Sequence, residues 1–421
     1  MRRALARSKC PAHTLGVVAL CEHHNWIAGG WRSAQGERWY AGPRTALAPH
    51  AERLDHRWPD SGERDVQAAV EAAGAAAPVW FERARAERWE HVERLAQALV
   101  RECDVASLAD ELGLDAQEFA PWQSEHELRL MEALELHREG LEAPGVVAFG
   151  AHWSDGAAML LARLGARLIN GQTAIVLVDS RTPHAGEALA RALETSTLPS
   201  GVVNVVHAQA REARDALLST PGLALVRWKA PQHELEQLSQ RFAARVGPHW
   251  EWWRCANRSV VVCERDNLEE SARSIAEQSF SRAATLGGQL PGHVARVFCH
   301  QRSYSRLCEE LRGRLLRDVA ASRPCRALED DLERHVLAQW TLGLDEGATA
   351  ILGAAPAARA QAAAEAPAGI VFVNVDPAGA LAQASRPAPV LSLVRVASDE
   401  EGRGLAEALD PGPRWRPDLT H

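Results

Sequence analysis

The sequence has 421 residues, of which 46% are hydrophobic and 24% charged, and its formal net charge is −8. This length allows two or three domains with large cores, and the balance is ordinary for a water-soluble globular protein. The negative charge, without a long run of Lys and Arg, argues against a nucleic-acid surface. The apolar run at 15–20 is too short to span a bilayer. We therefore expect a cytoplasmic protein that binds neither nucleic acid nor membrane.

Eight cysteines are scattered along the chain, and none belongs to a CxxC pair. This spacing argues against a zinc site or a redox motif, so we expect no metal. The stretch CEHHNW brings Cys21, His23 and His24 together. Adjacent histidines on a strand point to opposite faces and are poor co-ligands, so we expect this stretch to lie at the surface.

The first third of the chain predicts a hairpin followed by helices. The Gly29-Gly30 turn favours a hairpin over 22–34, whereas 35–60 look irregular. Apolar stripes at helical spacing cover 63–99, where Pro78 is expected to separate two helices. A third helix is expected over 104–112, and 115–143 are polar and mostly helical in character.

From residue 145 onwards, buried strands alternate with helices, a pattern typical of a doubly wound parallel sheet. Strands are expected at 145–150, 173–178, 201–206 and 223–228, with helices at 156–168, 185–195 and 212–219. A second α/β unit begins near Ser259. Its strands are expected at 259–264, 295–300, 348–353, 369–374 and 390–396, its helices at 267–281, 303–317 and 330–342, and a loop at 354–367.

Several segments, in this order, resemble the aldehyde dehydrogenase superfamily over about 26–396. They are WIAGGW, VQAAVEAAGAAAPVWFERARAERWEHVERLAQAL, LPSGVVNVV, GGQLPGHVARVF, DEGATAILGA and APVLSLVRV. The resemblance implies a Rossmann-type, dinucleotide-binding-like domain over 15–252, a smaller α/β catalytic-like domain over 253–398, and a C-terminal tail over 399–421. It also implies that the oligomerisation arm is missing, because only 115–143 fill its place and they do not alternate as strands.

The family's chemistry uses a cysteine nucleophile, a glutamate base, and an asparagine side chain with a backbone N–H that holds the oxyanion. By this resemblance the cysteine falls at Pro291, which has no nucleophile and no backbone N–H. The asparagine falls at Ser154, and the glutamate falls at Trp253, or at Glu251 if a gap is allowed. No catalytic residue is then intact. Cys299 is the candidate for a relocated nucleophile, although a cysteine in a buried strand is usually inert.

The resemblance implies a parallel loss of the residues that grip NAD(P). The lysine that binds the adenosine ribose falls at Leu177, and the glutamate that grips the nicotinamide ribose falls at Ser385. The Gly-Ser pair beside the pyrophosphate falls at Lys229 and Ala230. Glycine allows a phosphate to approach the N–H groups of a helix N-terminus, and Lys229 blocks that approach. We expect no cofactor, or at most weak binding of NAD(P).

Together these substitutions predict a catalytically degenerate aldehyde dehydrogenase. It resembles the inactive second half of the two-domain family-16 aldehyde dehydrogenases, here as a free chain. The expected role is structural or regulatory, in a hetero-oligomer with an active aldehyde dehydrogenase. Two alternatives stay open: an active NAD(P)-dependent aldehyde oxidoreductase that uses non-standard residues, and a module that binds a nucleotide or acyl ligand without turnover.

The family's usual self-paired dimer is expected to be absent. Beyond Val396 the sequence is helical and then Pro-rich, and Pro411, Pro413 and Pro417 each lack a ladder donor. We therefore expect the strand at 390–396 to be an exposed sheet edge, which a partner with an intact arm covers by strand addition. Alone, the chain is expected to be a monomer.

Three tryptophans, Trp250, Trp252 and Trp253, are close together in the sequence. They are expected to fill space rather than to stack a ligand. The resemblance to aldehyde dehydrogenases implies that Trp253 fills the vacated catalytic cleft.

Overall fold

The computed structural model describes residues 20–41, 55–115, 117–120, 143–243, 248–321, 325–328, 332–353, 369–384, 387–410 and 414–415. The chain forms two compact units, which are described separately. The first unit comprises 1–111, 123–228 and 239–251, and the second comprises 112–122, 229–238 and 252–421.

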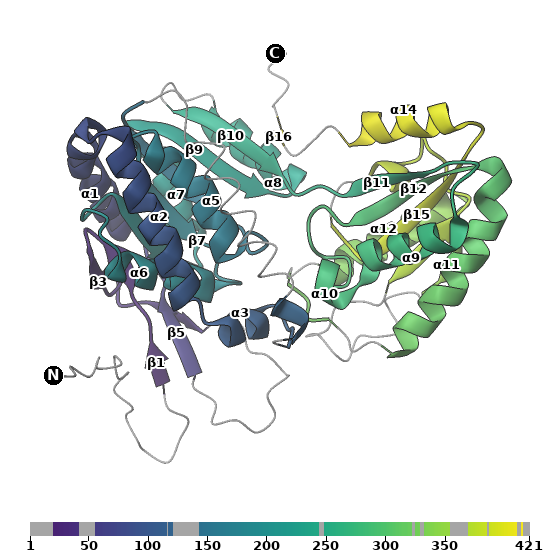
Figure 1. Cartoon of the computed structure of the whole chain (residues 1–421), viewed down its shortest axis with the longest axis horizontal. Coiled ribbons are helices and arrows are strands. Elements are labelled where there is room, and N and C mark those ends of the chain that lie inside the picture. Colours follow the sequence, from purple (N-terminus) through teal and green to yellow (C-terminus); the bar gives the residue numbers. More distant parts are fainter. Residues whose placement is uncertain are drawn as a thin grey trace. The chain divides into compact units, whose positions relative to one another are not determined.

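A mainly parallel sheet is the core of the first unit (Figure 1). Its strands follow the order β9-β6-β7-β8-β2-β3, in which β6 to β9 are parallel and β2 and β3 form the expected hairpin. These strands are β2 (Asn25–Ile27), β3 (Gly30–Arg32), β6 (Val146–Gly150), β7 (Thr173–Val178), β8 (Val203–His207) and β9 (Leu223–Ala230). The buried, Val-rich strands and the alternating helices confirm the predicted doubly wound sheet.

Helices α1 and α6 both pack against β7 and β8, and α5 packs against β7. The helices of this unit are α1 (Glu63–Glu82), α2 (Arg85–Glu102), α3 (Val105–Glu111), α5 (Gly156–Ile169), α6 (Pro183–Thr195) and α7 (Arg211–Ser219), followed by a π-helical turn (Ser239–Ala243). The helices expected at 104–112, 156–168, 185–195 and 212–219 are present, with ends shifted by a few residues.

The expected helix break at Pro78 is wrong, because Pro78 lies inside α1 and the chain turns only at Arg83. A proline inside a helix removes one backbone donor and costs about 3 kcal/mol. Ala77 and Trp80 on either side are buried, and the Trp80 indole donates a hydrogen bond to the Leu168 carbonyl at 3.0 Å. Burial of a tryptophan with its N–H satisfied offsets the lost bond.

A small three-stranded sheet was not predicted. It has the order β1-β5-β4, formed by β1 (Leu20–Glu22), β4 (Trp39–Ala41) and β5 (Asp55–Pro59). The expectation that 35–60 are irregular is therefore wrong for β4 and β5. These strands are short and mixed in polarity, so they carry no period-2 signal. Figure 1 shows β1 and β5 running side by side, in parallel register with Cys21 opposite His56.

The second unit contains a five-stranded sheet of order β11-β12-β15-β14-β13, parallel except for the β13–β14 pair. Its strands are β11 (Arg258–Val262), β12 (Val294–His300), β13 (Thr349–Leu352), β14 (Ile370–Val373) and β15 (Val390–Val396). Its helices are α8 (Gln232–Leu238), α9 (Leu268–Phe280), α10 (Arg282–Thr285), α11 (Gln301–Ala321), α12 (Leu332–Asp345), α13 (Ala380–Gln383) and α14 (Asp399–Leu409). All five strands match expected segments.

The expectation that the strand at 390–396 is an exposed edge is wrong. This strand, β15, lies between β12 and β14 and is almost wholly buried, as suits its continuous apolar run. The sheet's edges are β11 and β13. At the β11 edge, the Ser259 backbone N–H donates to Asp410 Oδ2 at 2.5 Å, just after α14. The short strand β16 (Arg414–Trp415) pairs antiparallel with β10 (His249–Arg254) in this unit.

Several expectations lie outside the described residues. They concern Ser385, the loop at 354–367, most of 115–143, and Pro411, Pro413 and Pro417. Within the part of the chain that the structure describes, no helix is long and apolar enough to cross a membrane.

Candidate active site

The carboxyl ends of β6, β7 and β9 meet at one edge of the first unit's sheet. In open α/β sheets, ligands bind outside this edge, where the strand order reverses. The order β9-β6-β7-β8 reverses between β6 and β9. The residues that follow these strands therefore decide whether the edge can receive a dinucleotide.

The loop after β6 is closed by its own hydrogen bonds. His152 Nδ1 lies 2.8 Å from the Ser154 hydroxyl, and the Trp153 backbone N–H donates to Asp179 Oδ2 at 3.0 Å. Asp155 pairs with Arg163 at 2.8 Å. All four loop residues from His152 to Asp155 are buried. Ser154, at the expected oxyanion-asparagine position, is thus engaged within its own loop and only 7% exposed.

Asp179, directly after β7, was not predicted from the sequence to belong to the site. Its carboxylate accepts the Trp153 N–H and two bonds from the Arg181 guanidinium, at 2.8 and 2.6 Å. Burial alone would raise the pKa of Asp179, but the neighbouring Arg181 charge outweighs it and lowers that pKa. The ionised carboxylate ties the loops after β6 and β7 together. The sequence signal for this ion pair is an acidic residue followed two positions later by a basic one, directly after a buried strand.

Leu177 lies near the end of β7, opposite Gly150 of β6 and Val206 of β8. Its apolar side chain is 7% exposed and offers no hydrogen-bonding group. A Cβ atom added at Gly150 would lie 2.5 Å from Cε3 of Trp228, so the indole rests directly on this glycine. Trp228 is itself buried. Protein side chains therefore fill the end of the sheet at β6 and β9.

Lys229 and Ala230, in the second unit, are the last residues of β9. They continue the strand, whereas the family's Gly-Ser pair was expected to precede a phosphate-binding helix N-terminus. Ala230 is buried, and its carbonyl accepts the Cys255 backbone N–H at 2.9 Å. Helix α8, which follows, has only seven residues. Ser385 cannot be placed, because it lies outside the described residues.

Glu251, the alternative position for a general base, is held by two arginines of the first unit. Arg167 contacts Oε1 at 2.5 Å and Arg227 contacts Oε2 at 2.6 Å. Burial would raise the pKa of Glu251, but the charges of Arg227 and Arg167 outweigh it and lower that pKa. A carboxylate with both oxygens paired is a poor proton acceptor. Trp253, the other base position, is a half-buried residue of β10 in the second unit.

Pro291 lies in a tight loop of the second unit between α10 and β12. The Thr285 carbonyl accepts the backbone N–H groups of Gly288, Gln289 and Leu290 at 3.0 to 3.1 Å, which fixes the turn. Gly288 has φ +89°, and a Cβ there would meet the Ser279 carbonyl at 3.0 Å, so glycine is required. The loop is therefore well ordered by its own contacts, yet Pro291 brings neither a nucleophile nor an N–H to it.

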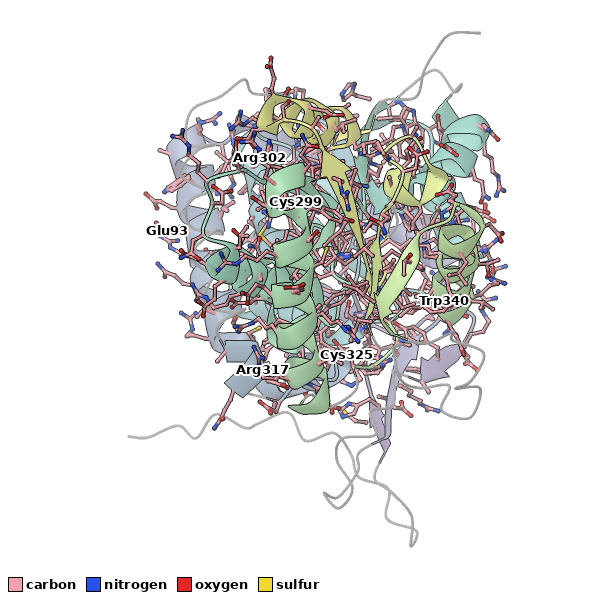
Figure 2. All side chains as sticks on the ribbon, turned by 90° about the vertical axis from the view of Figure 1, so that its right-hand side faces the viewer. Glu93, Cys299, Arg302, Arg317, Cys325 and Trp340 are labelled. Atoms are coloured by element: carbon pink, nitrogen blue, oxygen red, sulfur yellow. The ribbon has the colours of Figure 1, made fainter. Side chains whose placement is uncertain are left out.

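Cys299 lies in β12 and is fully buried in a core cluster with Leu307 and Leu311 of α11. Figure 2 labels Cys299 beside this helix. Burial, with a smaller contribution from Cys308, raises the pKa of Cys299 to about 12. At neutral pH this sulfur is a thiol, which is not the nucleophilic form.

The tryptophans of β10 differ in burial. Trp252 is 2% exposed, whereas Trp250 and Trp253 are half-buried. The burial of Trp252 agrees with the expected packing role. The expectation that Trp253 fills a catalytic cleft stays a prediction.

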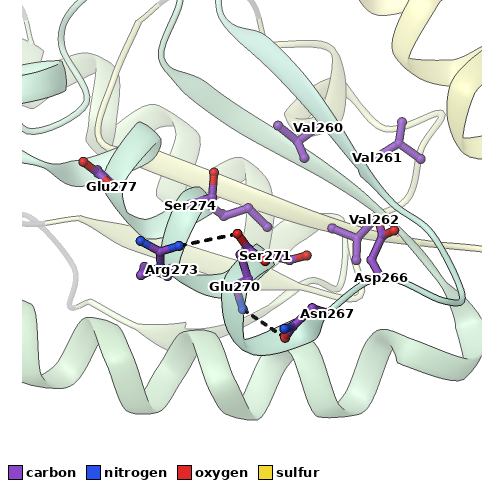
Figure 3. Close-up of a pocket in the computed structure, with 11 residues that line it drawn as sticks. Val260, Val261, Val262, Asp266, Asn267, Glu270, Ser271, Arg273, Ser274 and Glu277 are labelled. Carbon is purple, nitrogen blue, oxygen red and sulfur yellow. Dashed lines mark hydrogen bonds and ion pairs between the residues drawn. The ribbon is translucent and has the colours of Figure 1, made fainter.

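An open groove of about 420 Å³ lies between the edge strand β11 and helix α9 of the second unit (Figure 3). Val260 and Val262 form one wall, and the first turns of α9, with Glu270 and Arg273, form the other. It has no buried titratable group and no candidate nucleophile among its lining residues, so it offers binding surface rather than chemistry.

The chain is an α/β protein of two units, one of which is built on a Rossmann-type sheet. The chain belongs to the aldehyde dehydrogenase family, whose family model matches residues 41–412. The chain is 26% identical over 275 residues to bovine 2-aminomuconic semialdehyde dehydrogenase, covering 59% of this chain and 54% of that protein. It is 28% identical over 221 residues to N-succinylglutamate 5-semialdehyde dehydrogenase of Caulobacter, covering 46% and 42%. The chain thus spans about half the length of these curated relatives.

Solved structures of the family share the fold. Aldehyde dehydrogenase C of Pseudomonas syringae, solved with NAD⁺ and octanal, matches with a TM-score of 0.78 and 18% identity, covering 91% of this chain and 82% of that one. An aldehyde dehydrogenase of Bacillus cereus, solved with NAD⁺, matches with a TM-score of 0.77 and 20% identity, covering 92% and 82%. These likenesses confirm the predicted fold class.

Proposed function

We propose that this chain is a catalytically inactive aldehyde dehydrogenase that acts as a structural or regulatory partner of an active one. The observation that carries the proposal is Pro291. The family resemblance puts the nucleophile at this position, and the loop around it is held by the hydrogen bonds to Thr285. A proline there removes covalent catalysis and one oxyanion donor together.

The groups that would have to replace the missing chemistry are engaged elsewhere. Glu251 is held between Arg167 and Arg227, and Cys299 is a buried thiol. Ser154 bonds within its own loop. Each arrangement supports loss of function, because a base, a nucleophile and an oxyanion donor must all be accessible and act as a unit.

The residues at the carboxyl edge of the first unit's sheet do not fit a dinucleotide. Trp228 covers Gly150, and the apolar Leu177 stands where a ribose-binding lysine is expected. The NAD⁺ in the related structures belongs to those proteins. We therefore derive no step through NAD(P) and propose weak binding at most.

Trapping of the covalent intermediate tests the proposal. The pure chain is incubated with NAD⁺ and octanal, and its intact mass is measured. We expect no acyl adduct. The control is an active family member whose general-base glutamate is replaced by glutamine, because that variant forms the thioester and cannot readily hydrolyse it. An adduct on this chain, located to any cysteine by peptide mapping, would refute the proposed loss of the nucleophile.

The partner role rests on the edges of the second unit's sheet. Because β15 is central, a strand added by a partner must pair at β11 or β13, and the Ser259 N–H of β11 is already bonded to Asp410. We therefore favour β13. Light scattering of the chain alone should give a monomer, and co-expression with an active aldehyde dehydrogenase of the same source should give a stable hetero-assembly. A tight homodimer would contradict the first part, and separate elution of the two chains would contradict the second.

A further inference from the structure

A cluster of histidine, cysteine and glutamate side chains lies in the first unit and contains no residue of the expected active site. Cys21, His23 and Glu187 are buried, and His56 and His184 are half-buried. Cys21 lies on β1 directly opposite His56 of β5, so both side chains emerge at the same point of that small sheet. His23 follows β1. His184 and Glu187 lie three residues apart on α6, and therefore share a face of the helix.

The surface position expected for Cys21 and His23 is wrong, since both are buried, at 8% and 7% exposure. The alternation of faces is as expected: His24 points the other way, towards Ser33. Residues two apart on a strand face the same side, which brings Cys21 and His23 together. The remaining ligand candidates come from two distant segments, so no short motif marks the group.

The ligand atoms are close to the spacing that a metal ion needs. The ligand atoms of Cys21, His23 and His56 lie within 4.8 Å of one another, as do those of His23, His184 and Glu187. His23 Nε2 and His56 Nδ1 are 2.8 Å apart. Ligands of a tetrahedral zinc ion lie about 3.3 to 3.8 Å apart, so shifts of about 1 Å would let Cys21, His23 and His56 bind one ion. His184 shares its group with His23 and Glu187 only, so its ring must move towards Cys21 and His56 to become the fourth ligand.

The three imidazole rings are also almost equally far from one another. Their centres are 5.1 Å apart for His23 and His56, 5.2 Å for His56 and His184, and 5.8 Å for His23 and His184. Three imidazoles bound to one tetrahedral ion have ring centres about 5 Å apart. The flat face of Trp58 stacks on His23 at 4.4 Å and fixes the orientation of that ring.

Two buried carboxylates orient two of the rings. Glu187 Oε2 lies 2.7 Å from His23 Nδ1, and Glu111 Oε1 lies 2.7 Å from His184 Nδ1. Because a carboxylate only accepts, each Nδ1 carries the proton, which leaves Nε2 as the ligand atom. Histidines that bind metals usually donate their other N–H to a carboxylate in this way. His184 Nε2 is buried and has no hydrogen-bond partner in the described part of the chain.

A cavity of about 160 Å³ borders the cluster and gives an ion a route in. Besides the cluster it is lined by Glu102, Asp104 and Arg191. Two acidic side chains at the cavity favour the approach of a cation. Arg191 pairs with Glu187 at 2.6 Å, so its charge is directed at the orienting carboxylate.

We propose that Cys21, His23 and His56 bind a divalent zinc-like ion, with His184 closing the coordination sphere and Glu187 and Glu111 orienting the imidazoles. One thiolate and three imidazoles suit Zn²⁺ and its substitute Co²⁺, and not Mg²⁺ or Ca²⁺, which prefer oxygen ligands. Four protein ligands make a closed, structural site. The ion would join β1 and β5 to α6, and so stabilise the small sheet.

The test uses the purified full chain, stripped with a chelator and titrated with zinc chloride. Elemental analysis after desalting should give one zinc per chain, and zinc should raise the melting temperature. Replacement by Co²⁺ should give the intense visible bands of tetrahedral coordination and a thiolate-to-cobalt charge-transfer band. These measurements on the unaltered chain need no variant to fold. Substoichiometric zinc, or an octahedral cobalt spectrum, would overturn the proposal.

Matched variants then locate the ion. Cys21→Ser should remove the charge-transfer band and weaken zinc binding at least tenfold, and His184→Gln should also weaken it at least tenfold. His24→Gln is the control, because it alters the adjacent histidine on the opposite face and should leave the affinity unchanged. Equal zinc affinity in all three variants, measured by competition with a chromogenic chelator, would place the ion elsewhere and refute this site.

Discussion

Trp228 lies directly on Gly150: a Cβ atom at that glycine would be 2.5 Å from Cε3 of the indole. The two residues are opposite one another on β9 and β6, at the carboxyl edge of the sheet. This contact puts a tryptophan side chain where an open α/β sheet ordinarily receives its ligand. The proposed loss of NAD binding therefore rests on the packing of the first unit as well as on Pro291.

The contact predicts that Gly150→Ala destabilises the first unit. The added methyl group overpacks a filled space, which typically costs 1–3 kcal/mol in the free energy of unfolding. Urea unfolding measures the change. Gly74→Ala is the matched control, because nothing lies within 4 Å of a Cβ there and alanine favours a helix. Adding Trp228→Leu should recover part of the loss, and strictly additive effects of the two substitutions would contradict the contact.

The side chains at the carboxyl edge of the first unit's sheet predict weak binding of NAD(P). Each charged hydrogen bond lost from a ribose or phosphate costs about 1.5–3 kcal/mol, and two such losses move a micromolar dissociation constant towards the millimolar range. Isothermal titration calorimetry with NAD⁺ and NADP⁺ measures the affinity. Low-micromolar binding of either would show that Leu177 and Trp228 do not obstruct the site.

Cys299 is predicted to be unreactive in the folded chain. With its pKa raised to about 12 by burial, about one molecule in ten thousand carries the thiolate at pH 8. Iodoacetamide at pH 8 should modify the half-buried Cys263 first and Cys299 only after unfolding, as followed by peptide mass spectrometry. Rapid native-state labelling of Cys299 would revive it as a relocated nucleophile.

His293, two residues after Pro291, predicts a loss of stability in acid. Burial outweighs its hydrogen bond to the Leu290 carbonyl and lowers the pKa of His293 to about 4, from 6.5 in an unfolded chain. Between these values the unfolded chain binds a proton that the folded chain does not, so stability is full above about pH 6.5 and falls towards pH 4. The whole effect is on the order of 3 kcal/mol. In urea unfolding from pH 7.5 to 4.5, His293→Gln should show a shallower pH dependence, and an unchanged slope would contradict this assignment.

The sequence predicted those parts of the fold that rest on continuous patterns. The Val-rich strands β6, β7 and β8 and the helices between them carry strong apolar periodicity, so their positions are right within a few residues. The helix break expected at Pro78 is absent because the packing of Trp80 outweighs the local effect of the proline. The edge position expected for β15 was wrong because strand order depends on which strands pair, and local sequence does not encode it.

For the candidate sites too, local patterns predicted some residues, whereas contacts between residues distant in sequence were not predicted. Pro291, Leu177 and Ser154 could be singled out because a family pattern assigns them positions. The contact of Trp228 with Gly150, and the ion pairs that hold Glu251, join residues distant in sequence and depend on the strand register. The cluster around His23 was missed for that reason: Cys21 meets His56 only through the pairing of β1 with β5, a pairing that leaves no periodic signal.

The central claim is the loss of catalysis, and the most direct test is NADH formation by the pure chain with NAD⁺ and a panel of aldehydes. We predict no rate above that of the heat-denatured protein. Pro291→Cys should also be inactive, because Ser154, Glu251 and the filled cofactor edge would remain as they are. Aldehyde-dependent NADH formation by the unaltered chain that is abolished by Cys299→Ser or Glu251→Gln would contradict the account.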